Sequence, residues 1–186
     1  MATVVALLRG VNVGGRNTVP MADLRRLLAE AGYQRVRTYI QSGNVVLDQP
    51  RARPAAVAAH VHNVIAGHLG LDIPVIALSS SALAAVTAAN PYGDEPDPRR
   101  VHVFFLPAPL DAPSRARLDE AQAAVAAKGS RDRVHAAGTT MYLHTPDGFG
   151  RSDLASALMT RGPGAHRAGT ARNLATVAAL VALCGT

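Results

Sequence analysis

The chain has 186 residues, of which 48% are hydrophobic and 17% are charged, so it can form one globular domain or two small ones. No basic region precedes the short apolar run at the N-terminus, and the apolar C-terminal run falls well short of the about 20 residues that a bilayer-spanning helix needs. The single cysteine, Cys184, excludes an internal disulfide and a thiolate metal cluster. These features predict a cytoplasmic protein without a signal peptide or a membrane partner.

The net charge of +6 and the isoelectric point near 10.4 raise the question of a nucleic-acid partner, because clustered cations gain affinity by releasing phosphate counterions. The basic residues are dispersed, however, and no basic run exceeds two, as in Arg25-Arg26. Dispersed arginines are typical of a solvated surface. Nucleic acid is therefore kept as an alternative partner.

The first half of the chain predicts a βαββαβ order, which is the ferredoxin-like arrangement. Alternating residues on both sides of Ser42-Gly43 predict a hairpin with a two-residue turn. Apolar residues at helical spacing predict the first helix, and Gly32 is expected to end it. The predicted elements are strands over 3–9, 36–41, 45–47 and 72–77 and helices over 20–31 and 53–69.

The second half repeats this pattern of elements, which predicts an internal duplication. A linking helix over 80–89 and a loop rich in proline and aspartate separate the halves. We therefore expect an α+β fold with a first ferredoxin-like unit over 1–79, a linker over 80–98 and a second unit with a C-terminal helix over 99–186. The predicted elements of the second unit are strands over 101–106, 133–136 and 140–144 and helices over 111–127, 151–159 and 171–184.

The stretch LRGVNVGGRN, residues 8–17, follows the first strand and is richer in polar groups than a turn requires. Its glycine spacing nearly matches the phosphate-binding loop, but Arg16 and Asn17 stand where that motif needs lysine and a hydroxyl residue. A simpler anion site remains, because glycine-loop amides and arginines attract oxyanions. The plain alternative is a structural turn. The candidate ligand residues here are Arg9, Asn12, Gly14, Gly15, Arg16 and Asn17.

The first hairpin supplies a second polar group. Alternation places Arg37, Tyr39 and Gln41 on one face and packs Val36 and Ile40 against the helices. We expect the polar face to be open, where an aromatic beside amides could bind a nucleic-acid base. A half-buried strand tyrosine is the structural alternative. The candidates are Tyr39, Gln41, Ser42 and Asn44.

The second half carries Ser152 at the start of a helix, where it is a natural N-cap. A nucleophilic role for Ser152 would need a base, and His144 is the candidate nearest in sequence. The histidines show no ligand spacing, so we expect no metal site, and we expect no cofactor. The reaction class of any enzyme stays open.

The runs LLRGVNVGGRNTVPMADLRRLL, VRTYIQSGNVVL, NPYGDEPDP, MYLHTPDGFGRSDLASAL and TARNLATVAAL resemble the domain-of-unknown-function 1697 family, an uncharacterised bacterial group. The resemblance covers essentially the whole chain and implies an α+β fold of ferredoxin-like character without an established activity. Asp153 departs from a typical lysine, and Leu174-Ala175 from a usual Trp-Asn pair. The family pattern carries onto Arg9, Gly10, Asn12, Gly14, Gly15, Asn17, Tyr39, Gln41, Ser42, Gly43, Asn44, Arg151, Ser152, Arg172, Asn173 and Thr176.

The leading hypothesis is an anionic small ligand, phosphate- or nucleotide-like, held in a cleft made from the glycine loop, the QSGN turn and the TARN segment, with Arg151, Ser152, Arg172 and Asn173 as further candidates. One alternative is a nucleic-acid-binding module that uses open sheet faces. Another is an enzyme of hydrolase or phosphotransferase type. A third assigns these polar loops to stability alone, with Asn12 and Asn44 locking the loop to the turn.

Overall fold

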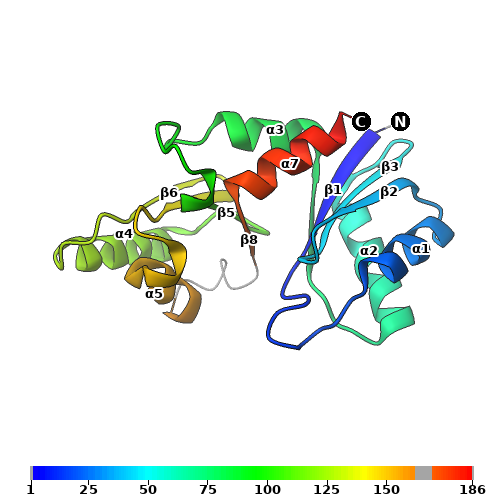
Figure 1. Cartoon of the computed structure of the whole chain (residues 1–186), viewed down its shortest axis with the longest axis horizontal. Helices are drawn as coiled ribbons and strands as arrows, with labels where there is room; N and C mark the ends of the chain where they lie inside the picture. The colour runs from blue at the N-terminus through cyan, green and yellow to red at the C-terminus, as the bar shows by residue number, and fades with distance from the viewer. Residues whose placement is uncertain (1, 162–168, 186) are drawn as a thin grey trace. The chain divides into compact units, whose positions relative to one another are not determined.

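The computed structural model describes residues 2–161 and 169–185, and Figure 1 shows its elements. Two compact units make up the chain: unit 1 comprises Met1–Ala85 with Ala178–Thr186, and unit 2 comprises Val86–Val177. Each unit has a four-stranded antiparallel sheet, in the orders β2-β3-β1-β4 and β6-β7-β5-β8. The orders are equivalent, so the predicted α+β fold of two ferredoxin-like units is confirmed.

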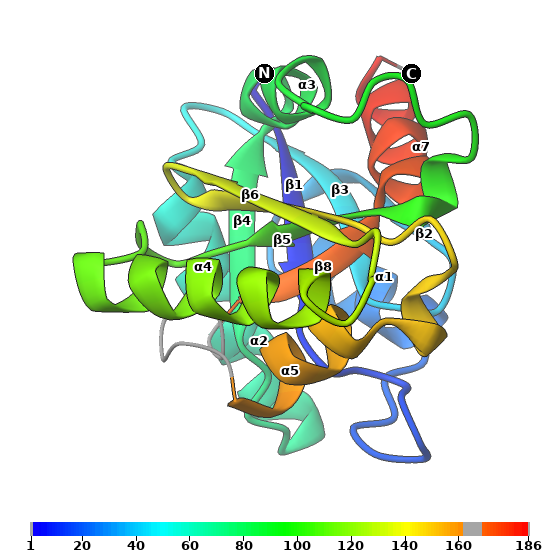
Figure 2. The same ribbon diagram turned by 90° about the vertical axis from the view of Figure 1, so that its left-hand side faces the viewer.

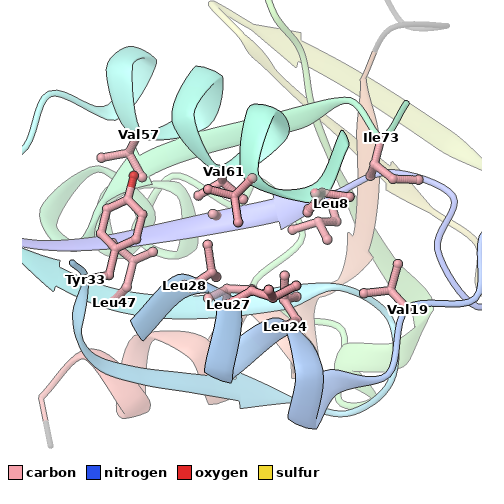
Figure 3. Packing of buried hydrophobic residues seen from close by; sticks show 14 of the residues in the cluster. Leu8, Val19, Leu24, Leu27, Leu28, Tyr33, Leu47, Val57, Val61 and Ile73 are labelled. Carbon is pink, nitrogen blue, oxygen red and sulfur yellow. The ribbon is translucent and has the colours of Figure 1, made fainter. Parts of the chain in front are cut away.

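Helices α1 and α2 cover one face of the sheet of unit 1 (Figure 1). Figure 3 shows Leu28 of α1 facing Val61 of α2 in the buried core, with Leu8 of β1 in the same cluster. The four apolar residues of the predicted α1 stripe are all buried. Unit 1 contains β1 (Ala2–Leu8), α1 (Met21–Glu30), β2 (Gln34–Tyr39), β3 (Asn44–Gln49), α2 (Pro54–Leu69), β4 (Val75–Ser79) and most of α3 (Ser80–Ala88).

The opposite face of this sheet is buried as well. Val5 and Leu7 of β1 and Val46 of β3 point away from the α1 and α2 side and have no exposed surface. The last turns of α7 (Leu174–Cys184) belong to this unit, and Nη1 of Arg37 donates a 2.7 Å hydrogen bond to the carbonyl oxygen of Leu183. The guanidinium thereby meets the negative end of the helix dipole. The expectation of an open binding face on this hairpin is wrong.

In unit 2, α4 and α5 lie on the same side of the sheet, as Figure 2 shows. Phe104, Leu118 and Leu154 belong to the core between them. The other face is closed too, because Tyr142 is buried and its hydroxyl donates a 2.8 Å hydrogen bond to the carbonyl oxygen of Val86. Unit 2 contains β5 (Val101–Phe105), α4 (Ala112–Ala126), β6 (Arg133–Ala137), β7 (Thr140–His144), α5 (Asp153–Arg161) and β8 (Thr170–Asn173), with short 3-10 turns at Pro98–Arg100 and Phe149–Arg151.

Three local expectations are corrected by the fold. The predicted helix over 171–184 begins only at Leu174, because TARN is the strand β8 and pairs with β5. The strand expected over 72–77 begins at Val75. The hairpin turn spans residues 40–43, and Ile40 is 53% exposed with a φ of +46°, so it does not pack against the helices.

The helix over 80–89 is confirmed as α3, but the units divide within it, between Ala85 and Val86. The C-terminal helix, expected in the second unit, begins in unit 2 and ends in unit 1. Within the described ranges, no helix has the length and apolar character to cross a membrane.

Candidate functional site

The glycine-rich loop, residues 9–17, folds as a small hairpin. The backbone amide of Asn12 donates to the carbonyl oxygen of Asn17 at 3.1 Å. The backbone amide of Arg16 donates to the carbonyl oxygen of Val13, also at 3.1 Å. Gly14 and Gly15 form the turn with φ values of +57° and +73°. A type I′ turn needs positive φ at both central residues, which explains the glycine pair. The loop therefore does not open a helix as a phosphate-binding loop does, and α1 starts only at Met21.

Asn12 connects this hairpin to the turn of the neighbouring β2-β3 hairpin. Its side-chain nitrogen donates to the carbonyl oxygens of Gln41, at 2.6 Å, and of Val19, at 3.0 Å. Its side-chain oxygen accepts from the amide of Val19 at 2.9 Å. A further backbone bond joins Leu8 to Gly43 at 2.8 Å. We call residues 9–17 and 40–43 together the loop–turn end of unit 1.

The other two asparagines of the predicted site are also used internally. Asn44 is fully buried, and its side-chain nitrogen donates to the carbonyl oxygen of Tyr39 at 3.2 Å and to the hydroxyl of Ser42 at 2.9 Å. Asn17 donates to the carbonyl oxygen of Gly10 at 3.1 Å. Asn44 thus fixes the turn itself, and Asn12 joins the loop to it. These three side chains are engaged within the protein.

Exposed donors remain at the loop–turn end. Arg9, Arg16 and Gln41 are exposed, and neither arginine has an ion-pair partner in the part of the chain that the structure describes. Within the described part of the chain, the backbone amides of Gly14 and Gly15 also have no hydrogen-bond acceptor. The surface therefore presents positive charge and unused N–H groups. Val13, 66% exposed, and Ile40 add apolar surface.

The predicted site residues of unit 2 have structural roles, except Arg151, which is exposed. The hydroxyl of Ser152 accepts from the amide of Ala155 at 2.8 Å, which confirms the expected N-cap, and donates to the Asp132 carboxylate at 2.7 Å. Asn173 caps α7 by accepting from the amide of Thr176 at 2.8 Å.

Arg172 is buried in strand β8. Its guanidinium donates to the Thr170 hydroxyl at 2.8 Å and to the Ala171 carbonyl at 2.7 Å. Burial lowers the pKa of Arg172 to about 10. TARN is thus an edge strand of unit 2, and the exposed candidates that come together around the glycine loop all belong to unit 1.

His144 does not serve Ser152 as a base. Its Nε2 atom lies 2.6 Å from a carboxylate oxygen of Glu95, and its ring stacks on Tyr92 with centroids 5.0 Å apart. The hydrogen bond to His144 holds the pKa of Glu95 below its usual range. The arrangement needed for a serine nucleophile with this base is therefore absent from the described residues. They also contain no group of three metal-ligating side chains.

A pocket that the sequence interpretation missed lies at the start of α2 in unit 1. It has a volume of about 290 Å³, and its lining includes Tyr33, Arg51, Arg53 and His60 but no residue of the predicted ligand set. The hydroxyl of Tyr33 lies 3.0 Å from Nδ1 of His60. The sequence signal was the run RARP, in which two arginines, separated by one alanine, precede a helix-opening proline.

Comparison with known proteins agrees with this architecture. Residues 1–142 match the family model described as "Protein of unknown function (DUF1697)". The fold is similar to that of the conserved bacterial protein SP0830 from Streptococcus pneumoniae, with a TM-score of 0.72, 21% sequence identity and 98% of each chain covered. No curated protein matches the chain.

Proposed function

The chain belongs to the DUF1697 family of proteins of unknown function, and we propose that it binds a phosphate-bearing ligand at the loop–turn end of unit 1. The observation that carries the proposal is the group of unused donors there. They are the guanidinium groups of Arg9 and Arg16 and the amides of Gly14 and Gly15. Arginine binds phosphate oxygens through paired N–H groups, and consecutive backbone amides add neutral donors.

Asn12 supports this proposal by holding the loop in place before a ligand arrives. Its three side-chain hydrogen bonds join the loop base to the hairpin turn, so the donors project from a fixed frame. A site that is ordered in advance loses less conformational entropy on binding. Val13 and Ile40 add exposed apolar surface that suits the sugar or base of a nucleotide-like ligand.

A nucleic-acid partner is the second candidate, and the same arginines favour it. The buried sheet faces remove its original basis, so any such contact would run through the phosphate backbone. Binding of this kind weakens steeply as salt increases, because counterions are released. Salt dependence therefore separates an extended polyanion from a single bound phosphate.

The test is a titration of the ¹⁵N-labelled full chain with inorganic phosphate, adenosine monophosphate and an eight-residue oligoadenylate RNA at several salt concentrations. We expect the amide signals of Gly14 and Gly15 to shift. We also expect Arg9→Gln with Arg16→Gln to weaken binding by about tenfold or more, which is about 1.4 kcal/mol.

The matched control is Arg117→Gln, an exposed arginine of α4 in unit 2, combined with Arg115→Gln to give the same change of net charge. Equal weakening by this pair would indicate a general charge effect and overturn the site. Unchanged signals of Gly14 and Gly15 with all three probes would overturn the proposed function.

A further inference from the structure

The pocket at the start of α2 has the features of a second ligand site. Its volume of about 290 Å³ is close to the lower end of the roughly 300–1,000 Å³ found for small-molecule pockets. It forms where β3 ends, the connection to α2 turns and Tyr33 enters from the end of α1. All of its lining residues lie in unit 1, and it shares none of them with the loop–turn end.

The charged groups of the pocket are all basic. Arg51 and Arg53 line it, both are exposed, and neither has an ion-pair partner among residues 2–161 and 169–185. His60 lies on the next turns of α2, and no aspartate or glutamate belongs to the lining. The pocket therefore favours anionic ligands over cationic ones.

One wall of the pocket is ordered by a buried side chain. Tyr33 is 4% exposed and lies beside Val57 in the core (Figure 3). Its hydroxyl lies 3.0 Å from Nδ1 of His60. The ring centroids of Tyr33 and His60 lie 5.4 Å apart. Arg51 has a φ of +53°, a strained conformation for a non-glycine residue that is often found at ligand sites.

The rest of the lining is small and apolar, with Pro50, Ala52, Ala56 and Val57 beside the amide of Gln49. We propose that this pocket binds a small organic phosphate of about the size of a pentose monophosphate. The two guanidinium groups take the phosphate, since together they offer paired donors to its oxygens. The apolar wall and Gln49 contact the carbon skeleton and its hydroxyl groups.

Isothermal titration calorimetry of the full chain with ribose 5-phosphate, ribose and inorganic phosphate tests this inference. We expect ribose 5-phosphate to bind, ribose not to bind, and inorganic phosphate to bind more weakly. Arg51→Gln with Arg53→Gln is expected to weaken ribose 5-phosphate by at least about tenfold. Tyr33→Phe, which keeps the ring and removes only the hydroxyl bonded to His60, is expected to weaken it less.

The matched charge control is Arg115→Gln with Arg117→Gln, the exposed pair of α4 in unit 2, which should leave the binding of ribose 5-phosphate unchanged. The loop variant, Arg9→Gln with Arg16→Gln, separates the pocket from the loop–turn end. Retained affinity in the loop variant, with shifted amide signals at residues 51–53 and 55–57 of the ¹⁵N-labelled chain, supports the pocket whether or not the loop binds phosphate. Equal affinity of the Arg51→Gln, Arg53→Gln variant and the natural protein would overturn the pocket as a site. Binding that is lost only in the loop variant would overturn it too and would instead favour the loop–turn end.

Discussion

The side-chain nitrogen of Asn12 lies 2.6 Å from the carbonyl oxygen of Gln41, 29 residues further along the chain. With its two bonds to Val19, this side chain fixes where the glycine hairpin sits on unit 1. We expect Asn12→Ala to lower the free energy of unfolding by about 1–3 kcal/mol, because it leaves partly buried backbone groups without partners. Urea denaturation followed by circular dichroism measures the loss.

Asn17→Ala is the matched control for this variant. Asn17 has a φ of +48°, close to the +55° of Asn12, so alanine meets similar backbone strain at both positions. Among the described residues, Asn17 makes a single side-chain hydrogen bond, which is exposed and runs to the carbonyl oxygen of Gly10. We expect it to lose clearly less stability than Asn12→Ala. Equal losses would mean that backbone strain, and not the bond to Gln41, dominates.

Gly43 is expected to tolerate a side chain far less than Gly14. A Cβ atom on Gly43 would lie 2.6 Å from both the Leu8 Cβ and the Val11 Cγ2 atoms, whereas one on Gly14 would meet nothing within 4 Å. Both glycines have positive φ, at +73° and +57°, so alanine should cost each of them about 1–2 kcal/mol in backbone strain.

The difference between the two alanine variants therefore reports the close packing of the turn on β1. We expect Gly43→Ala to cost about 1–3 kcal/mol more than Gly14→Ala, the usual penalty for overpacking a filled site. Thermal and urea unfolding of both variants measure it. Similar stabilities would show that the turn can move away from Leu8 without cost.

Asp48 makes the stability of unit 1 depend on pH. Its side chain is fully buried, and burial alone would raise its pKa, but hydrogen bonds from Thr3, at 2.7 Å, and from Arg35, with the charge of Arg37 nearby, outweigh burial and lower it. The folded protein thus binds this proton more weakly than the unfolded chain. The stabilisation is present above the unfolded pKa of about 3.9 and is lost as pH falls through the folded pKa.

Asp48→Asn should therefore destabilise the protein at pH 7, and the difference from the natural protein should shrink below about pH 4. The measurement is the free energy of unfolding in urea between pH 2.5 and 7. Asp72→Asn, at a side chain that is 95% exposed, is the control and should change the profile little. A difference that stays constant down to the lowest pH would contradict the assignment to Asp48.

Local periodicity was sufficient for the elements whose partners follow directly in sequence. The α1 stripe from Met21 to Leu28 is amphipathic by itself, and the alternation around Ser42-Gly43 specifies a hairpin without information from elsewhere. The turn length was missed because Ile40 adopts a left-handed conformation that its residue type disfavours.

Long-range pairing explains what the sequence interpretation missed. Strand β8, with the sequence TARN, is short and polar, and only its pairing with β5, from His102 to Phe105, makes it a strand. The sheet face under Arg37 is covered by the end of α7, 146 residues away, which no local pattern records. The pocket was missed for the same reason, since Tyr33 and His60 belong to different elements.

The structural role of Ser152 can be tested by measuring stability. Its hydroxyl caps α5 through the amide of Ala155 and donates to the buried carboxylate of Asp132, so Ser152→Ala removes a cap and leaves a buried acid without this donor. We expect a loss of about 2–4 kcal/mol, the sum of about 1 for the cap and about 1–3 for the carboxylate.

A double-mutant cycle with Asp132→Ala tests this division. In that background no buried carboxylate is left without its donor. Ser152→Ala should therefore lower the free energy of unfolding by only about 1 kcal/mol, the contribution of the cap. Urea unfolding of the four proteins gives the coupling energy directly. The same cost in both backgrounds would show that the bond to Asp132 contributes nothing to stability. Ser152 would then stabilise the protein only by capping α5.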